Sequence, residues 1–207
     1  MSAVPAVGPR GADERPPGVG LVPHRLPVLA ASATARTSLA AFHKALVALG
    51  LGHYNLVRLS SVIPPHTAVG VGRLGQGPAL EVGAGRTSQE LTAPARWRGP
   101  RPEDLVDGYH GDRLYCVYAE HGTDVAGEEV WAGVGWAQRV DGQGGYFVEH
   151  HGSTPDAVRE EIRTSLADMV EDEVAEFAPA EWLLEGVVCE SSPVCALVVV
   201  PYAVVGW

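Results

Sequence analysis

Two adjacent serines, Ser60 and Ser61, follow an apolar run that begins at Asn55 and stand shortly before two prolines. A serine hydroxyl can attack the carbonyl carbon of the preceding residue and turn that amide into an ester, if the hydroxyl is activated and the oxyanion is stabilised. Elimination from Ser61 would then free the carboxylate of residues 1–60 and leave a dehydroalanine, which hydrolyses to a pyruvoyl group and ammonia. The pair therefore has the residue types for self-cleavage between residues 60 and 61.

Asn55 is a candidate donor to the oxyanion of this reaction. It lies an even number of residues before Ser61, so a regular strand would place both side chains on one face. The alternative is structural, because a serine pair before prolines is ordinary turn chemistry. The serine dipeptide alone favours a turn. Self-cleavage needs support from the surrounding sequence.

A helix is predicted upstream of the serines. Thr37 caps it, Gly50 ends it, and it is followed by the strand-like run that enters the serine pair. Its larger apolar residues recur at helical spacing and predict the buried face: Leu39, Phe42, Leu46 and Leu49.

This helix, the stretch from Leu51 to Pro65 and the run Tyr146–His150 together resemble the pyruvoyl-dependent arginine decarboxylases. The resemblance covers about residues 21–65 and 109–207. It implies that the chain is cut between Ser60 and Ser61 and that Ser61 becomes a covalent pyruvoyl cofactor, with no need for pyridoxal phosphate or a metal. It also implies a homotrimer of cleaved protomers, with active sites between neighbouring subunits.

Glu149 occupies the position of the family's catalytic glutamate. The resemblance implies that the substrate amine forms a Schiff base with the pyruvoyl carbonyl, that CO2 leaves, and that Glu149 protonates the carbanion. A carboxylic acid that a dry site keeps protonated can donate this proton. The alternative is an exposed glutamate on an edge strand, since acidic residues are mostly exposed. Metal binding by Glu149 with its histidine neighbours is not expected, because no third ligand is evident.

The resemblance further implies that His43, Gly52 and Tyr54 contact the substrate. His43 stands where the family carries an aspartate thought to hold the substrate guanidinium. Imidazole offers at most one acceptor where a carboxylate accepts two parallel hydrogen bonds. Arginine to agmatine, a step of polyamine biosynthesis, is the first expectation. The alternatives are another amino acid, or an uncleaved, non-catalytic relative that acts as a binding or assembly protein; His43 is equally well explained as a surface residue.

The remaining pattern predicts an α+β fold. Strands are expected at Leu114–Glu120, Glu129–Val140 and Tyr146–His151, and two further strand-like segments lie near Trp182 and Cys195. The resemblance implies that they form a sandwich of two β-sheets flanked by helices. A long loop is expected at about residues 66–108, which are rich in Gly, Pro and Arg.

A second helix, acidic on its outer face, is predicted from Asp156 to Phe177, with Thr154 as its cap. Its core-facing stripe is predicted from helical spacing: Val158, Ile162, Leu166, Met169, Val170 and Val174.

The composition and charge of the chain limit the kinds of partner and the location that are expected. The 207 residues carry a net charge of −10, which argues against nucleic acid. One domain is expected over residues 21–207, after a disordered arm at residues 1–20. The three cysteines are expected to be buried thiols. No segment predicts a signal peptide or a membrane span, and a cytoplasmic protein is expected.

Overall fold

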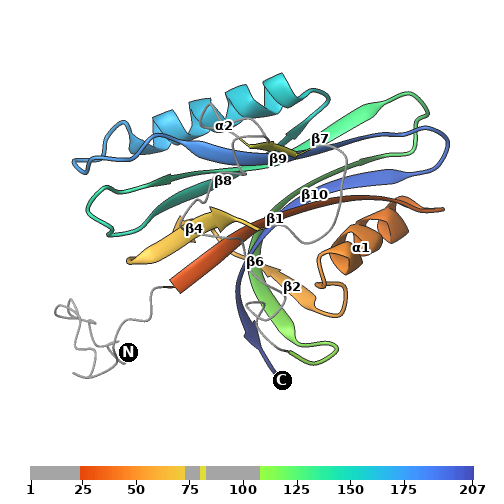
Figure 1. Ribbon diagram of the computed structural model, residues 1–207, viewed down its shortest axis with the longest axis horizontal. Helices are drawn as coiled ribbons and strands as arrows, with labels where there is room; N and C mark the ends of the chain where they lie inside the picture. Colours follow the sequence, from red (N-terminus) through yellow and green to blue (C-terminus); the bar gives the residue numbers. More distant parts are fainter. Residues whose placement is uncertain (1–23, 73–79, 83–107) are drawn as a thin grey trace, which may run out of the picture.

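The computed structural model describes residues 24–72, 80–82 and 108–207 and contains two five-stranded sheets (Figure 1). In order across the first sheet lie β2 (Asn55–Arg58), β6 (Arg113–Thr123), β10 (Val194–Val205), β1 (His24–Thr34) and β4 (Thr67–Val71). In order across the second lie β3 (Val62–Ile63), β8 (Gly145–Gly152), β7 (Glu129–Gln138), β9 (Glu181–Val188) and β5 (Leu80–Val82).

The two sheets pack face to face, and one helix covers each outer face. Helix α1 (Ser38–Ala48) lies on β1, β6 and β10, and α2 (Pro155–Val170) lies on β7, β8 and β9 (Figure 1). The side chains of strand β10 alternate between the two layers that cover it. Val198 and Val200 face the other sheet, whereas Leu197 and Val199 face α1. Because both faces are covered, nearly all of β10 is apolar. The predicted sandwich of two sheets flanked by helices is confirmed.

Helix α1 begins and ends where the sequence predicts. The Thr37 hydroxyl accepts a hydrogen bond from the Ala40 amide at 3.2 Å, and Gly50 has a φ of 73° just beyond the helix. The predicted buried face is wrong at Leu39, whose side chain is 78% exposed. The helix instead presents small residues, Ala41 and Ala45 among them, to the sheet, and these allow close packing.

Helix α2 is shorter than predicted, and this corrects the core-facing stripe. Thr154 caps it as expected, and Val158, Ile162 and Leu166 are buried. The helix ends at Val170 rather than Phe177, and Val174 is fully exposed. Acidic residues follow at the carbonyl end of the helix, where the dipole disfavours negative charge, and the chain turns so that Phe177 can form a bridge with Arg139.

The structure adds strands that the sequence patterns did not separate from loops. Strand β4 lies within the expected loop of residues 66–108 and pairs in parallel with β1, and β5 pairs with β9. Both are short edge strands, too brief for a periodic signal. The rest of that loop and the arm at residues 1–20 lie outside the described residues.

The cysteines and the helices were also the subject of predictions. The thiols of Cys116, Cys189 and Cys195 are free and buried, as expected, and burial raises the pKa of Cys116 to about 12. Neither helix of the described part of the chain has the length and the apolar composition needed to cross a membrane.

Candidate active site

The serine pair lies where the chain passes from one sheet to the other. Strand β2 forms an edge of the first sheet, and β3 forms an edge of the second. The Leu59 amide still donates to the Cys116 carbonyl of the first sheet at 2.9 Å, whereas the Ser61 carbonyl already accepts from the Phe147 amide of the second at 2.8 Å. Ser60 is exposed between them. A break at the 60–61 peptide would leave both flanking segments hydrogen-bonded to their own sheets.

Ser61 has a backbone conformation that is unusual for a residue with a side chain. Its φ is 67°, in the left-handed region, which costs about 1–2 kcal/mol for a non-glycine residue. The expectation of a regular strand from Asn55 to Ser61 is therefore wrong, because β2 ends at Arg58 and the chain turns sharply before β3. The strain is localised at the predicted cleavage point.

The Ser61 hydroxyl donates a hydrogen bond to the Oε1 atom of Glu149. Glu149 lies on β8, half-buried, and the loss of water around it raises the pKa of its carboxyl group. The hydrogen bond from Ser61 and the positive charge of Arg58 act in the opposite direction. The structure thus brings together Ser61 and Glu149, the two predicted catalytic residues.

An open pocket of about 470 Å³ adjoins this pair. In the described part of the chain, β3 pairs with β8 at Gly145 and Tyr146, and the pocket lies beside the following residues of β8, which have no partner strand there. It reaches across to one face of α2, and it is lined by Ser61, Phe147, Val148, Glu149, His150, Ser165, Asp168 and Met169. The pocket is large enough for a small molecule and gives it access to Ser61 and Glu149.

Two other polar groups of the pocket, His150 and Ser165, contact each other. The His150 Nε2 atom lies 2.8 Å from the Ser165 hydroxyl, and burial lowers the pKa of the imidazole. His150 is therefore held mainly neutral near pH 7. The carboxylate of Asp168 is the second acidic group in the lining, at the carbonyl end of α2.

Sequence reasoning missed two residues beside the serine pair. Tyr202 of β10 donates its hydroxyl to the Val62 carbonyl at 3.1 Å, across from one sheet to the other. Arg58 donates to the Tyr118 carbonyl at 2.6 Å and stacks over the Tyr118 ring, 4.1 Å from its centroid. Tyr202 is far from Ser61 in the chain, and no spacing links the two residues. Arg58 is close to Ser61 in sequence, but its contacts with Tyr118 join strands that are far apart in the chain.

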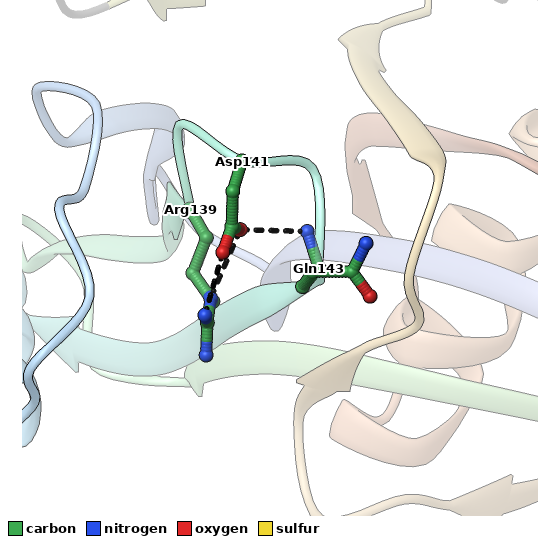
Figure 2. Close-up of polar contacts among 3 residues, drawn as sticks. All are labelled: Arg139, Asp141 and Gln143. Atoms are coloured by element: carbon green, nitrogen blue, oxygen red, sulfur yellow. Dashed lines mark hydrogen bonds and ion pairs between the residues drawn. The ribbon is translucent and has the colours of Figure 1, made fainter.

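The turn between β7 and β8 braces the segment that follows the serines. Arg139 binds Asp141 through two hydrogen bonds of 3.1 and 2.6 Å, and the Gln143 amide donates to the same carboxylate at 2.9 Å (Figure 2). The His66 amide donates to the carbonyl of Gly142 in this turn at 2.8 Å. A Cβ atom at Gly144 would lie 2.5 Å from the Ile63 carbonyl, so only glycine fits there. The turn and β3 are held in close contact.

The structure places Asn55 away from this arrangement, at the start of β2. Its side-chain amide donates to the Gly111 carbonyl at 2.5 Å, and its backbone amide donates to Asp112 at 2.8 Å. The side chain thus has a local partner at the opposite end of the strand from the serines. Its role as an oxyanion donor stays a prediction.

The predicted substrate-binding residues lie on or beside α1, on the outer face of the first sheet, and not in the pocket of the same chain. His43 is exposed on α1. A Cβ atom at Gly52 would lie 2.4 Å from Val47, and the Tyr54 ring packs on His53 at 3.9 Å between centroids. Contact between these residues and a substrate at Ser61 would therefore require a second subunit.

The chain resembles known proteins over most of its length. Residues 26–96 and 100–202 match the family model for pyruvoyl-dependent arginine decarboxylase. The chain belongs to this family. The pyruvoyl-dependent arginine decarboxylase of Pyrococcus horikoshii is 29% identical over 152 residues, which are 73% of this chain and 75% of that protein. The enzyme of the same name from Thermococcus kodakarensis is 30% identical over 150 residues, 72% of this chain and 73% of that protein.

A solved structure of a pyruvoyl-dependent histidine decarboxylase also matches, at 17% identity and a TM-score of 0.36. The match covers 48% of this chain and 53% of that one. The family predicted from the sequence is confirmed by the family model and the curated relatives.

Proposed function

We propose that this chain cuts itself between Ser60 and Ser61 and then decarboxylates an amino acid through a pyruvoyl group derived from Ser61. One observation carries the proposal: the hydroxyl of a serine with strained backbone donates to a carboxylate whose pKa is raised. A serine of an ordinary turn needs neither feature. Family membership supports the same chemistry.

The first reaction uses Glu149 as a base. Glu149 takes the proton of Ser61, whose oxygen attacks the Ser60 carbonyl carbon; the carbon–nitrogen bond then breaks and the Ser61 nitrogen becomes an amine. Loss of the Ser61 Cα proton and cleavage of its Cβ–Oγ bond release the Ser60 carboxylate. The remaining dehydroalanine takes up water and loses ammonia to give the pyruvoyl group. Relief of the left-handed backbone at Ser61 favours the first step.

The surroundings of Ser61 fit a pyruvoyl group at this position. The Ser61 carbonyl oxygen persists as the amide oxygen of that group, so the hydrogen bond from the Phe147 amide can persist as well. The neighbouring pocket then leads to the new terminus. A pyruvoyl group supplies a carbonyl that binds the substrate amine and accepts electrons as CO2 leaves.

Glu149 has a second task in turnover, as the acid that protonates the substrate α-carbon. A carboxyl group with a raised pKa is protonated over more of the pH range near neutrality. Burial supports both tasks, because it makes the carboxylate a stronger base and keeps the acid form available.

Arginine is the first candidate substrate, with agmatine as product, and another amino acid is the alternative. Within the chain, the pocket offers the carboxylate of Asp168 to a cationic side chain. The carbonyl end of α2 lies there too, with no basic residue in the last turn, and its dipole also favours a cation. His43 would add no second carboxylate if a neighbouring subunit brought it close.

A trimer with active sites between subunits would give α1 a partner. Leu39, His43 and Val47 recur every four residues on α1 and are exposed. Leu39 and Val47 are large apolar side chains on one exposed face of the helix, and a neighbouring subunit on this face would remove them from water. In such a trimer this face would bring His43, Gly52 and Tyr54 toward a neighbour's pocket. A cytoplasmic location is proposed as well.

The alternative is a non-catalytic relative that keeps the chain intact. His43 in place of the family's aspartate favours it. Purified Ser61→Ala protein tests the proposal against it: the variant should stay as one chain, whereas the native chain should be cut. Ser61→Cys should be cut slowly, because a thiol can make the same acyl shift.

Ser165→Ala is the matched control, because it removes a hydroxyl from the pocket but not from the cleavage point. It should be cut at the native rate. An intact native chain, with no carbonyl that reacts with hydrazine, would contradict the proposal.

A further inference from the structure

Strand β10 is irregular at one point, and this point faces the serine pair. Its pairing with β6 runs in register from Val194 to Pro201 and shifts before Ala203, which leaves Tyr202 as the residue of a β-bulge. Bulges change the direction of a side chain and often lie beside active sites. The inside-outside alternation changes here as well: Val198, Val200 and Tyr202 pack between the sheets, and Val204 packs against the α1 side.

The bulge directs the Tyr202 side chain onto the segment that follows Ser61. The hydroxyl donates to the Val62 carbonyl at 3.1 Å. The ring packs edge-on against Phe147, at 6.2 Å between centroids and 69° between planes. The amide of that same Phe147 donates to the Ser61 carbonyl. Two consecutive carbonyls, those of Ser61 and Val62, are therefore fixed from the two different sheets.

We infer that Tyr202 is a positioning residue for self-cleavage: its hydroxyl holds the 61–62 segment so that Ser61 keeps its strained backbone and its contact with Glu149. A strained residue persists only where its surroundings fix it. On the Ser60 side the hydrogen bond of the Leu59 amide lies two residues before Ser61 and Ser60 itself is exposed, so the contacts of the 61–62 segment are the ones next to the strained residue. The inference rests on the proposed cleavage at residues 60 and 61.

The hydroxyl is suited to this task because it remains a donor. Burial and the nearby Glu149 charge both raise the pKa of Tyr202. Tyr202 therefore stays protonated at the pH values at which the protein would be studied, and it keeps its hydrogen bond while Glu149 changes its protonation state.

The test is the rate of self-cleavage in Tyr202→Phe, which removes only the hydroxyl. Newly synthesised full-length chain is followed by mass spectrometry, and cleavage is expected to slow about five- to tenfold, the effect of losing one hydrogen bond. Tyr146→Phe is the matched control. The Tyr146 hydroxyl donates to Glu173 at 2.6 Å, on the strand next to Val62, and its loss should leave the rate unchanged.

Two further measurements separate positioning from a general loss of stability. The first compares Ser61→Ala, which cannot be cut, with the double variant Ser61→Ala/Tyr202→Phe and gives the change in unfolding free energy. The cleavage assays are then run at temperatures well below the unfolding transitions of the native protein and of Tyr202→Phe. Hydroxylamine, which cuts an ester, is expected to release less product from Tyr202→Phe because less ester forms. Tyr202→His, which keeps a ring and a donor, should cleave faster than Tyr202→Phe; if Tyr202→Phe does not fold, Tyr202→His and Tyr202→Leu make the same comparison.

Cleavage of Tyr202→Phe at the native rate, or slowing equal to that of Tyr146→Phe, would overturn the inference and leave the proposed function intact. If the native chain itself is never cut, the proposed function fails first. The two failures are thus distinguishable in one series of samples.

Discussion

Two glutamates point into the space between the sheets, and they differ in their access to a pocket and in their neighbours. Glu149 of β8 lies beside a pocket and accepts a hydrogen bond from Ser61. Glu185 of β9 is only 1% exposed, bonds to Ser32 of the opposite sheet, and has its Oε1 atom without a partner. Burial raises the pKa of both, that of Glu185 to about 7. A raised pKa alone therefore does not single out one of the two carboxyl groups for the proposed chemistry. The open pocket and the nucleophilic neighbour favour Glu149.

The largest expected effect separates the two glutamates by activity. Glu149→Gln should lower decarboxylation about 100-fold or more, because an amide cannot supply the proton of a positioned acid. Self-cleavage of the newly synthesised Glu149→Gln chain should slow too, because Ser61 loses its base. Glu185→Gln is the matched control and should leave both rates near the native values. Rates of CO2 release, measured per cleaved chain, check this; native turnover by Glu149→Gln would show that the proton comes from elsewhere.

The pH dependence of turnover sharpens the same comparison. The protonated form of a carboxyl group, which can act as an acid, disappears as pH rises through the pKa of the group. The pKa of Glu149 is raised. The native rate of decarboxylation should therefore fall on the alkaline side at a pH above the ordinary range for glutamate. The residual activity of Glu149→Gln should lack this fall. A fall that persists in the variant would belong to another group.

The next expected effect separates the glutamates by stability. The folded-state pKa of Glu185 is about 7 and the ordinary value is 4.5, so the folded protein binds more protons between these values. The unfolding free energy should fall as pH rises through this window, by about 3 kcal/mol in total from this residue. The difference between native protein and Glu185→Gln, measured by denaturant unfolding from pH 4 to 8, isolates it. A constant difference across the window would contradict the prediction.

The sequence predicted more about the elements and the reacting pair than about the contacts that arrange them. The caps at Thr37 and Thr154 are local signals, and they placed both helix starts correctly. The apolar runs of the central strands are local signals as well. The association of Ser61 with Glu149 came from the family resemblance, and the geometry agrees with it. The end of α2 was missed, because the periodicity of the side chains continues after the helix has stopped.

Other features could not be predicted because they depend on tertiary packing. The left-handed backbone at Ser61 arises from the passage between two sheets, and the bulge at Tyr202 arises from its pairing with β6. Glu185 is an acidic residue in a mainly apolar strand, and it is buried only because the first sheet packs against it. Asn55 was assigned to the face of Ser61 on the assumption of a strand that the structure interrupts.

The smallest expected effect concerns the substrate side chain. Neither of the two glutamates is expected to supply a carboxylate to it, because Glu149 is proposed to act as an acid and Glu185 is buried. If His43 reaches a neighbour's pocket, His43→Asp should restore a charge-assisted contact with a guanidinium, improving its binding by about 1.5–3 kcal/mol. Specificity constants for arginine and for amino acids without a guanidinium give the measure. An unchanged ratio would show that His43 lies outside the side-chain pocket.

The central claim is that the strained Ser61 beside Glu149 is a cleavage point, and the intact mass of the purified native protein tests it most directly. The account predicts two chains, residues 1–60 and 61–207, with the larger chain blocked at its amino end and reactive toward hydrazine. A single chain of the full 207 residues, unchanged after long incubation under native conditions, would contradict it.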